Sequence, residues 1–498
     1  MSRAIRALVA LVTMTLMLAA CSPGGNGPEK QTRTLTVGAS AEPPTMDPTA
    51  NDAAAIPQVL LYNVYETLVK LDSNGELKPL LAQRWEVSPD NLTYTFQLDP
   101  AAKFATGRKV TADDVAASIK KIKFGEVSPT LAKQMAVVAD VVPTDEDTVT
   151  VTLNKPSNEW LYNMSSTAGM IFDTTGDVDL AKATAGSGPY QLAEWNPGQN
   201  VVLSRTADYW GTDARFDEVV FRYFTDPNAM NAAMLSGELD IISNLQAPAA
   251  LSQFQDPEQF KVVEGTTNGE VVLSMNNTAP TLSDKRVRQA IRYAVDKKAL
   301  LDTVWNGHGT LIGSMVPPTD PWYEDLTGDY PHDPEKAKQL IAEAGAQGAT
   351  LRLRLPTLAY ARGAGQFVAS QLKDVGLNVV IDELEFPARW IDTVLTKGDY
   401  DLSIVSHVEA RDLSRFANPN YYFHYNNPEF TKLIEDGDAA DHDTYVADRR
   451  KAAKLLSDDA AADWLFLLPN LVITKPNISG VPQNATTLSF DLTTIAAG

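Results

Sequence analysis

The sequence predicts an α/β or α+β protein of two or three packed domains. A chain of 498 residues is too long for one hydrophobic core, which stops growing at about 250 to 300 residues. Segments of alternating hydrophobicity are interspersed with segments of helical periodicity, and no repeat of about 20 to 50 residues relates them. One arrangement occurs twice, in residues 237–242 and 398–404, where a glycine ends a helix and an aspartate introduces an apolar strand. We interpret the two copies as one α/β unit in each of two lobes, the alternative being a coincidence between two ordinary turns.

The first elements of the chain follow from alternation and from proline. Residues 35–37 predict a strand, and the prolines of 42–48 end any regular structure there. A helical stretch is expected next, because apolar residues fall on one face of a helix: Val59, Leu60, Val64 and Leu68.

Two further strands bracket a helix. Residues 92–98 and 149–153 alternate between apolar and polar side chains, as in half-buried strands. Between them Thr111 and Asp114 form a capping box, which predicts the start of a helix.

Near residue 186, the segment Gly-Ser-Gly-Pro-Tyr (186–190) precedes another series of predicted strands. Ser283 is expected to cap a strongly amphipathic helix that contains Val287 and Ile291. Asp296 restarts a helix that runs to Trp305, and Asp333, followed by proline, starts another that ends at Gly345.

Charge excludes two classes of partner. The formal net charge is −21, so there is no basic footprint for the phosphates of nucleic acid or for anionic lipid. After the first twenty residues, the sequence contains no run of about 18 apolar residues, the length that would predict a membrane span.

The amino terminus has the layout of a secretory signal. Arg3 and Arg6 precede an apolar run, which ends in Leu-Ala-Ala-Cys at Cys21. We predict a lipoprotein signal peptide at 1–20, a flexible tether at 21–30, and acylation of Cys21, which holds the protein to the outer face of a membrane. The alternative is an ordinary signal with a chance cysteine. Because Cys21 is the only cysteine, it leaves no internal disulfide, zinc–thiolate site or Cys–His catalytic pair.

The mature chain resembles the family 5 extracellular solute-binding proteins, the peptide- and nickel-binding type. Six motifs carry this resemblance, in the family's order and at its spacing: Leu-Lys-Pro-Leu-Leu-Ala-Gln-Arg-Trp (77–85) with the strand at 94–96, Lys-Phe-Ala-Thr-Gly (103–107), Thr-Ala-Asp-Asp-Val (111–115), Gly-Ser-Gly-Pro-Tyr (186–190) with Asp-Tyr-Trp (208–210), Arg-Val-Arg-Gln-Ala-Ile (286–291) and Ala-Val-Asp (294–296).

The resemblance implies a two-lobed clamp of the type II periplasmic-binding-protein class, with an extra α+β domain inserted in the first lobe. The ranges it implies are 30–50, 187–265 and 472–498 for lobe one, 51–186 for the inserted domain, and 266–471 for lobe two. Hinges are then expected near 265–269 and 469–475, where a few residues absorb the change on closure.

In peptide-binding members of the family, an acidic residue after a strand of lobe two holds the ligand's ammonium group. Counting back from Phe416, the resemblance places that residue at Glu409, with Asp412 as the second choice. Arg411 is a candidate for a ligand carboxylate, and it is more readily expected to pair with Glu409 or Asp412.

Four more residues are candidate ligand contacts. His407 replaces the tryptophan usual in peptide binders, which weakens the peptide interpretation and, with His424, raises a nickel or chelate alternative. Asp52 lies where some members contact the ligand from lobe one. Trp390 and Tyr421 are candidate aromatic walls, although a packing role is the ordinary one for each.

We therefore expect a binding protein for a di- or oligopeptide that serves the permease and ATPase subunits of an ABC importer, as a monomer and without a cofactor. Other ligands left open are an oligosaccharide, another small solute or a nickel chelate. No nucleophile elbow, Walker loop, zinc-protease motif or dinucleotide fingerprint points to an enzyme. A glycosidase-like hydrolase and a structural surface lipoprotein are the distant alternatives.

Overall fold

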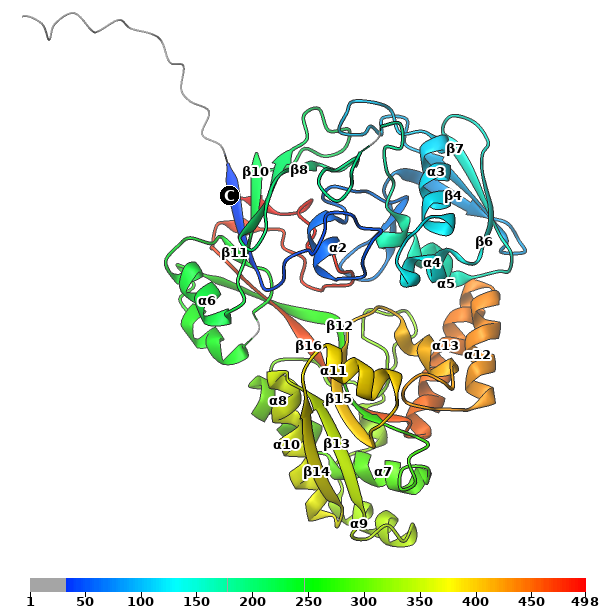
Figure 1. Ribbon diagram of the computed structural model, residues 1–498, viewed down its shortest axis with the longest axis vertical. Coiled ribbons are helices and arrows are strands. Elements are labelled where there is room, and N and C mark those ends of the chain that lie inside the picture. Colours follow the sequence, from blue (N-terminus) through cyan, green and yellow to red (C-terminus); the bar gives the residue numbers. More distant parts are fainter. Residues whose placement is uncertain (1–32, 177, 246) are drawn as a thin grey trace, which may run out of the picture. The chain divides into compact units, whose positions relative to one another are not determined.

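The computed structural model describes residues 33–176, 178–245 and 247–498 (Figure 1). The predicted signal, the tether up to residue 30 and Cys21 lie outside the described residues. Thr34–Gly498 forms one compact unit. Within the described ranges, no helix has both the length and the apolar character that a membrane crossing requires.

A ten-stranded mixed sheet is the frame of this unit. Its strands follow the order β14-β13-β15-β12-β16-β11-β1-β10-β9-β8. Their bounds are β1 (Thr34–Ala39), β8 (Tyr190–Asn196), β9 (Asn200–Arg205), β10 (Glu218–Tyr223), β11 (Ile241–Ile242), β12 (Lys261–Met275), β13 (Thr350–Pro356), β14 (Asn378–Leu384), β15 (Leu402–His407) and β16 (Ala462–Thr474).

The two long antiparallel strands β12 and β16 run through both halves of this sheet (Figure 1). We call the half with β1 and β8–β11 lobe one, and the half with β13–β15 lobe two. The register of β12 and β16 shifts between Thr266 and Glu270, which is where the two halves meet. The two-lobed clamp is thus confirmed, whereas the residue limits given above for each domain stay a prediction.

Helices cover both lobes. Lobe one carries α6 (Pro227–Leu235). The helices of lobe two are α7 (Lys285–Ala294), α8 (Lys297–Trp305), α9 (Pro334–Glu343), α10 (Ala359–Asp374), α11 (Ala388–Trp390), α12 (Pro428–Ala439) and α13 (His442–Asp458). The 3₁₀-helix η5 (Asp412–Ala417) follows β15.

A second, four-stranded antiparallel sheet lies in the segment between β1 and β8, at the upper right of Figure 1. We call this segment the inserted domain. Its sheet has the order β4-β5-β7-β6. Its elements are α2 (Ala55–Leu60), β2 (Val69–Leu71), β3 (Leu77–Pro79), β4 (Ala82–Val87), β5 (Thr93–Leu98), α3 (Ala112–Phe124), α4 (Pro129–Met135), β6 (Val138–Pro143), β7 (Thr148–Leu153) and α5 (Asn158–Asn163). The short strands β17 (Ile478–Ser479) and β18 (Ala496–Ala497) pair near the carboxyl end.

The central strands of lobe two are buried on both faces, and the two faces belong to different cores. Leu273 on β12 and Ile404 on β15 pack into the core beneath α7, α8 and α10. Val272 and Val405, one position away, pack into the core that contains Trp390 and Tyr422. Alternation along β12 therefore directs successive side chains to opposite faces.

Most predicted elements are confirmed, and two need correction. Asp114 accepts the Thr111 N–H at the start of α3, and the Asp333 carboxylate accepts the Lys336 N–H at the start of α9. The helical stretch predicted over 59–68 is wrong in extent, because α2 ends at Leu60. The cap of α7 is Asp284, which accepts the Arg286 N–H, and not its neighbour Ser283.

Two motifs that are far apart in the sequence meet at one buried carboxylate. Glu66 of the inserted domain accepts hydrogen bonds from Ser187 (2.8 Å), Tyr209 (2.5 Å) and the Trp210 indole (3.0 Å). The glycines beside Ser187 pass close to the backbone, since a Cβ at Gly186 would stand 1.9 Å from the Val64 carbonyl oxygen. Tyr209 and Trp210, which follow β9 of lobe one, thus hold the inserted domain on lobe one through Glu66.

The repeated glycine–aspartate arrangement builds the same contact in both lobes. Asp240 accepts the N–H of Thr36 on the neighbouring parallel strand at 2.8 Å, and Asp401 accepts that of Arg352 at 2.8 Å. Gly237 and Gly398 both adopt positive φ, as expected where a glycine ends a helix. The interpretation of one α/β unit in each lobe is therefore confirmed in its geometry.

Candidate functional site

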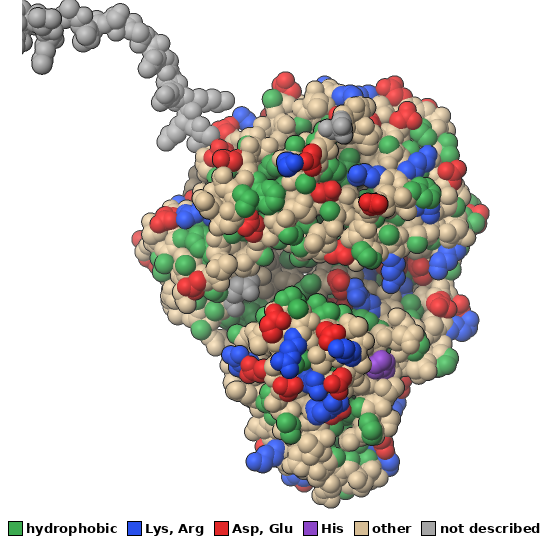
Figure 2. Space-filling view, viewed as in Figure 1, with side chains coloured by type: hydrophobic (Ala, Val, Ile, Leu, Met, Phe, Trp, Pro, Cys, Tyr) green, Lys and Arg blue, Asp and Glu red, His purple; other side chains and the backbone are tan. Residues whose placement is uncertain are grey.

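A cavity of about 190 Å³, the cleft cavity, lies where the inserted domain faces the loop after β15. Figure 2 shows the hollow between the two lobes. The inserted domain contributes Asp52, Thr130, Gln134 and Tyr162, β12 contributes Asn268, and lobe two contributes Val408, Glu409 and Ala410. The cleft cavity therefore brings together two of the predicted ligand contacts, Asp52 and Glu409, from opposite sides.

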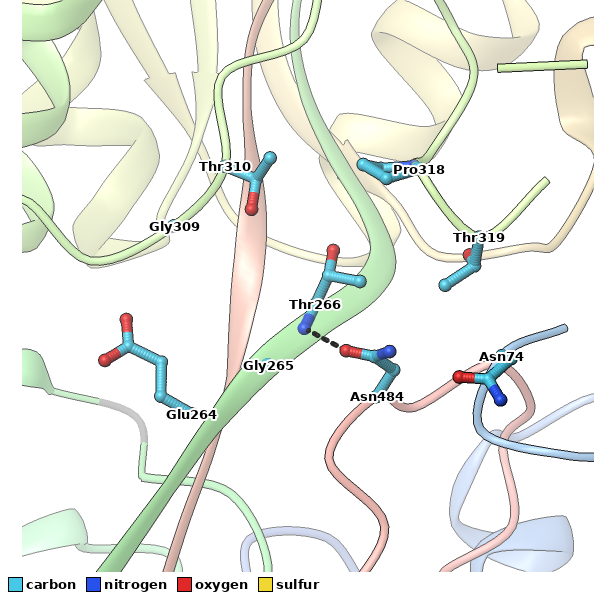
Figure 3. Close-up of a pocket in the computed structure, with 9 residues that line it drawn as sticks. All are labelled: Asn74, Glu264, Gly265, Thr266, Gly309, Thr310, Pro318, Thr319 and Asn484. Carbon is cyan, nitrogen blue, oxygen red and sulfur yellow. Dashed lines mark hydrogen bonds between the residues drawn. The ribbon is translucent and has the colours of Figure 1, made fainter.

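A second cavity of about 590 Å³, the hinge cavity, lies beside the crossing of β12 and β16 (Figure 3). Its lining consists of backbone, hydroxyl and amide groups and the ring of Pro318, with one charged residue, Glu264, whose carboxylate is 3.0 Å from His308 Nδ1. The Thr266 N–H donates to Asn484 across this cavity at 3.0 Å. None of the predicted ligand contacts lines it, so the chemistry of the site is to be sought in the cleft cavity.

Glu409 is the accessible acid of lobe two. It follows β15 in an irregular loop, and its side chain is 52% exposed. Its carboxylate forms an ion pair with Arg415 of η5 at 2.7 Å. A carboxylate that lines a cavity and has one cation partner can still accept hydrogen bonds from a ligand ammonium group.

Asp412 is the buried acid. Its side chain is 1% exposed, and among the described residues no hydrogen-bond donor reaches either carboxylate oxygen. Burial raises the pKa of Asp412 well above its usual range, although the nearby charge of Arg415 acts in the opposite direction. Asp412 therefore takes up a proton more readily than an exposed aspartate does.

His407 connects the two acids to an aromatic cluster. Its Nε2 is 2.8 Å from the Tyr422 hydroxyl, and its Nδ1 is 3.5 Å from Asp412 Oδ2. Burial, with a smaller effect of Arg415, lowers the pKa of His407 to about 3. The ring is therefore neutral at physiological pH, and its contact with Asp412 is not a charge pair.

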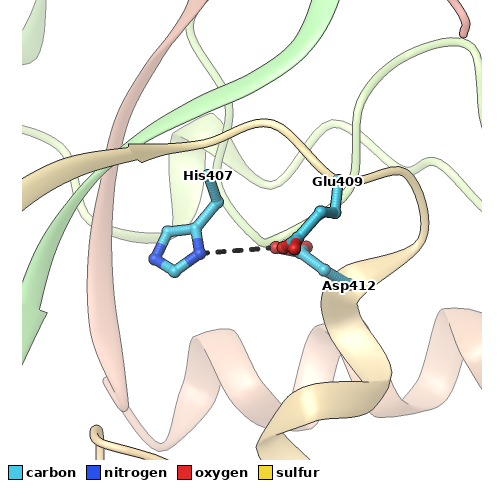
Figure 4. Close-up of side chains that lie close together, drawn as sticks. All are labelled: His407, Glu409 and Asp412. Carbon is cyan, nitrogen blue, oxygen red and sulfur yellow. Dashed lines mark ion pairs between the residues drawn. The ribbon is translucent and has the colours of Figure 1, made fainter. Parts of the chain in front are cut away.

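His407, Glu409 and Asp412 converge closely enough to be considered as metal ligands (Figure 4). One potential ligand atom from each lies within 4.8 Å of the others. His424, the second histidine of the nickel alternative, is not part of this group; its Nδ1 lies 3.4 Å from the Pro419 carbonyl oxygen. The set of donors, one imidazole and two carboxylates, is chemically suited to a transition metal or to an organic cation.

Arg411 differs from expectation, because it pairs with neither Glu409 nor Asp412. Its guanidinium lies over the Tyr162 ring at 3.5 Å from the centroid, and 4.9 Å from that of Trp322. Tyr162 belongs to α5 of the inserted domain, so this cation–π contact spans the cleft. Arg415, which sequence reasoning missed, forms the ion pair that was expected of Arg411.

The remaining predicted contacts have local partners. Asp52 accepts from the hydroxyls of Ser128 and Thr130 at 2.5 and 2.9 Å and stays at the surface of the cleft cavity. The Tyr421 hydroxyl is 3.5 Å from His407 Nδ1, next to the acids. Trp390 lies in the core of lobe two, where its indole donates to Ser403 at 3.1 Å, and we do not retain it as a wall.

Two acids near this site were also missed by sequence reasoning. Glu270 on β12 is 1% exposed, and it lies opposite His407 of β15 in the sheet. Burial raises the pKa of Asp320 to about 7. The only signal for Glu270 was a charge directly before the apolar run 271–273, where a buried strand is not expected to carry one.

A polar contact also joins the inserted domain to lobe two at the side away from β12. Glu159 of α5 forms an ion pair with Arg449 of α13 at 3.0 Å and accepts the Tyr445 hydroxyl at 2.7 Å. The Ser157 hydroxyl and the Glu159 N–H donate to Asp438 of α12. We call this set the clasp, and it holds the two sides of the cleft together.

Comparisons with known proteins agree with this architecture. Residues 76–430 match the model of the bacterial extracellular solute-binding proteins, family 5. The chain is 27% identical over 475 residues to a probable D,D-dipeptide-binding periplasmic protein of Escherichia coli, covering 87% of this chain and 88% of that one. It is 28% identical over 377 residues to the heme-binding protein A of Haemophilus influenzae, with 68% and 69% covered.

The fold has solved counterparts. A periplasmic binding protein, DppA, from Helicobacter pylori in complex with the peptide STSA superimposes with a TM-score of 0.77. The superposition covers 93% of this chain and 98% of that one, at 22% identity.

Proposed function

Because this chain belongs to the bacterial extracellular solute-binding proteins, family 5, we propose that it captures a di- or oligopeptide in the cleft cavity and delivers it to an ABC importer. Proteins of this family are extracytoplasmic and act with the permease and ATPase subunits of such importers. The proposal concerns the ligand, its contacts and the way the protein is held at the membrane.

The observation that carries the peptide assignment is the pair of acids that follows β15. Glu409 lines the cleft cavity, and Asp412 lies behind it with no hydrogen-bond donor among the described residues. A peptide brings an ammonium group into the cleft, and a desolvated ammonium requires a carboxylate partner. We assign Glu409 as that partner and Asp412 as the second choice.

The opposite side of the cleft cavity suits the rest of a peptide. Its lining from the inserted domain and the carboxyl-terminal segment is neutral and polar or aliphatic, apart from Asp52. Amide and hydroxyl groups such as Asn268 and Thr130 can bond to main-chain groups of any peptide, which gives binding without strong sequence selection. Arg411, held by Tyr162, and Tyr421 complete the proposed contacts.

A metal chelate is the second candidate. The grouping of His407, Glu409 and Asp412 within 4.8 Å favours it, because a neutral imidazole with two carboxylates is a possible coordination set. An oligosaccharide or another small solute has no comparable observation in its support.

The remaining parts of the proposal concern anchoring and chemistry. Cys21 would carry the lipid that holds the protein to the membrane, and the chain would work as a monomer. It would release its ligand unaltered, since closure of the clamp requires no bond to be broken.

The test is to identify what the purified protein carries and what closes it. Mass spectrometry of ligand released by denaturation should find peptides, and added peptide should raise the free energy of unfolding by about 2.7 kcal/mol at a hundredfold excess over Kd. Small-angle scattering should show compaction in the same samples. Chemically altered peptide after long incubation, or stabilisation by nickel chelates and not by peptides, would contradict the proposal.

A further inference from the structure

Two buried charged residues elsewhere in lobe two, Asp463 and Arg449, have partners of opposite charge. Asp463 on β16 is fully buried and forms ion pairs with Arg292 (3.3 Å) and Lys297 (2.7 Å). Arg449, also buried, pairs with Glu159. Such pairing is the rule, because an isolated charge inside a protein is strongly unfavourable.

Glu270 and Asp412 break this rule. Glu270 is 1% exposed, and its Oε2 has no hydrogen-bond partner among the described residues; neither oxygen of Asp412 has one. The cations near this site are committed elsewhere, since Arg415 pairs with Glu409 and Arg411 stacks on Tyr162. Two buried acids, both near His407, are thus left without an ion pair to an arginine or lysine among the described residues.

The sheet register places these two acids together. Glu270 and His407 are directly opposed on the antiparallel strands β12 and β15, so their side chains leave the same face of the sheet. His407 Nδ1 is 3.5 Å from Asp412 Oδ2 on that face. Burial raises the pKa of Glu270 well above its usual range, and the charge of Asp412 adds to the effect. Each of these acids is therefore harder to ionise than an exposed carboxyl group.

This pair lies directly behind the cleft cavity. The cavity reaches β12 at Asn268, two residues before Glu270, and reaches the loop after β15 at Glu409. Figure 4 shows the carboxylates of Glu409 and Asp412 directed toward one another. The carboxylates of Glu409 and Asp412 lie within 4.8 Å of one another, so a ligand group that reaches Glu409 stands next to the first of the two buried acids.

We propose that Glu270 and Asp412 form a second, buried cation subsite, and that the ligand is a peptide with a lysine-like basic side chain in addition to its ammonium group. This inference rests on the proposed function and names the class of peptide. The ligand's α-ammonium group binds at Glu409, and the side-chain cation binds at the buried pair. Each carboxylate that ionises on binding releases its proton to solvent, so charge balances in the filled site.

The first experiment compares basic side chains with an uncharged isostere. The probes are tri-alanine peptides with lysine or norleucine at the first, second or third position, measured by titration calorimetry at pH 7.5. At one position or more, lysine should bind about 10- to 100-fold more tightly, because a charge-assisted hydrogen bond to a buried carboxylate contributes that much. Equal affinities at all positions would overturn the subsite and leave the proposed function standing. If no peptide of the set binds, the proposed function itself fails.

Isosteric variants then show which residues are responsible for the preference for lysine over norleucine. Glu270→Gln should reduce the lysine preference to about threefold or less and leave the norleucine peptide within about twofold of wild type. Asp412→Asn should reduce the lysine preference by a similar factor. Glu335→Gln, on α9 of the same lobe, is the control for loss of one acid, since its side chain is 83% exposed. Without ligand, the two site variants should melt no lower than wild type. If Glu270→Gln melts lower and weakens both peptides equally, its role is structural and the subsite is wrong.

Proton release tests the same inference on the unaltered protein. Calorimetry of wild type in buffers of different ionisation enthalpy should show more protons released with the lysine peptide than with the norleucine peptide. The acidic groups facing Glu270 (Asp412, Glu409 and Asp320) all hinder its ionisation, and Arg415 favours that of Asp412. Equal proton release would overturn the inference. Binding of nickel chloride alone, lost in Asp412→Asn, with no lysine preference would reassign the acids to a metal.

Discussion

The two sides of the cleft cavity treat their acidic residues in opposite ways. On the inserted domain, Asp52 is held at the surface by the hydroxyls of Ser128 and Thr130. On lobe two, Asp412 and Glu270 are buried with carboxylate oxygens that no described residue satisfies. A carboxylate whose hydrogen bonds are made within the protein needs no ligand, whereas a buried carboxylate without such bonds is a candidate binding site. We therefore propose that lobe two selects charge and that the inserted domain supplies neutral contacts and closure.

The comparison predicts its largest effect at Glu409. Glu409→Ala should weaken the binding of an unmodified peptide by about 2–4 kcal/mol, because the ligand ammonium is then buried without a partner. Acetylation of the peptide's amino group should cost wild type a similar amount and the variant much less, as titration calorimetry can establish. Additive losses would show that Glu409 and the ammonium do not meet, and the same cycle would then be run on Asp412→Asn.

A smaller effect is expected at the clasp, away from the ligand. Glu159→Ala leaves the buried Arg449 without its ion pair, so the free energy of unfolding should fall by about 1–3 kcal/mol in denaturant titrations. The pair is partly exposed at Glu159, which keeps the loss below that of a fully buried pair. Lys432→Ala, which removes an exposed pair with Asp436, is the control and should change stability by less than about 0.5 kcal/mol. Equal losses in both variants would mean that the clasp has no special role.

The free energy of unfolding should depend on pH through Asp320. Its folded pKa of about 7 lies above the usual value near 4, so the folded state retains a proton that the unfolded chain loses. Burial of this carboxyl group therefore does not lower the free energy of unfolding below about pH 4. Between about pH 4 and pH 7 it lowers that free energy progressively. Asp320→Asn should raise the free energy of unfolding by about 1–2 kcal/mol at pH 8 and leave it nearly unchanged at pH 4. A gain that is the same at both pH values would contradict the burial of this carboxyl group.

The contact between Arg411 and Tyr162 should increase peptide affinity, because it stabilises the closed form of the protein. Arg411→Gln and Tyr162→Leu should each weaken peptide binding by about 0.5–2 kcal/mol, the range of a cation–π contact, and the double variant should lose little more. Calorimetry measures the affinities, and small-angle scattering shows whether the closed form is less populated. If Arg411 instead holds the ligand's carboxylate, amidation of the peptide's carboxyl end will abolish the effect of Arg411→Gln.

The smallest effect is expected at Asp52. Asp52→Asn keeps an acceptor for Ser128 and Thr130, so peptide affinity should change by less than about 0.5 kcal/mol. A loss as large as that of Glu409→Ala would show that both walls select charge, and would remove the distinction between them.

Local signals predicted those parts of the fold that depend on neighbours in the sequence. The caps at Asp114 and Asp333 and the glycine–aspartate arrangements at 237–242 and 398–404 are each set within a few residues. The stretch 59–68 was wrong because its apolar residues are buried by the tertiary fold and not by one helix.

The candidate site was predictable only in part, and the reason is the same. Glu409 and Asp412 follow a recognisable strand, so the family's spacing places them near a ligand. Arg411 is turned away from both by Tyr162, a residue of another domain, which spacing along the chain does not reveal.

The sequence by itself determined the two-lobed α/β architecture, the binding-protein family and the loop that carries the predicted acids. Only the tertiary structure decided which acids are buried and which have partners. The register of β12 against β15, two strands that are far apart along the chain, places Glu270 opposite His407. Whether a carboxylate is exposed to solvent, paired with a cation or buried without a partner depends on all the groups packed around it. Its pKa and its ability to bind a ligand are therefore set by the tertiary structure.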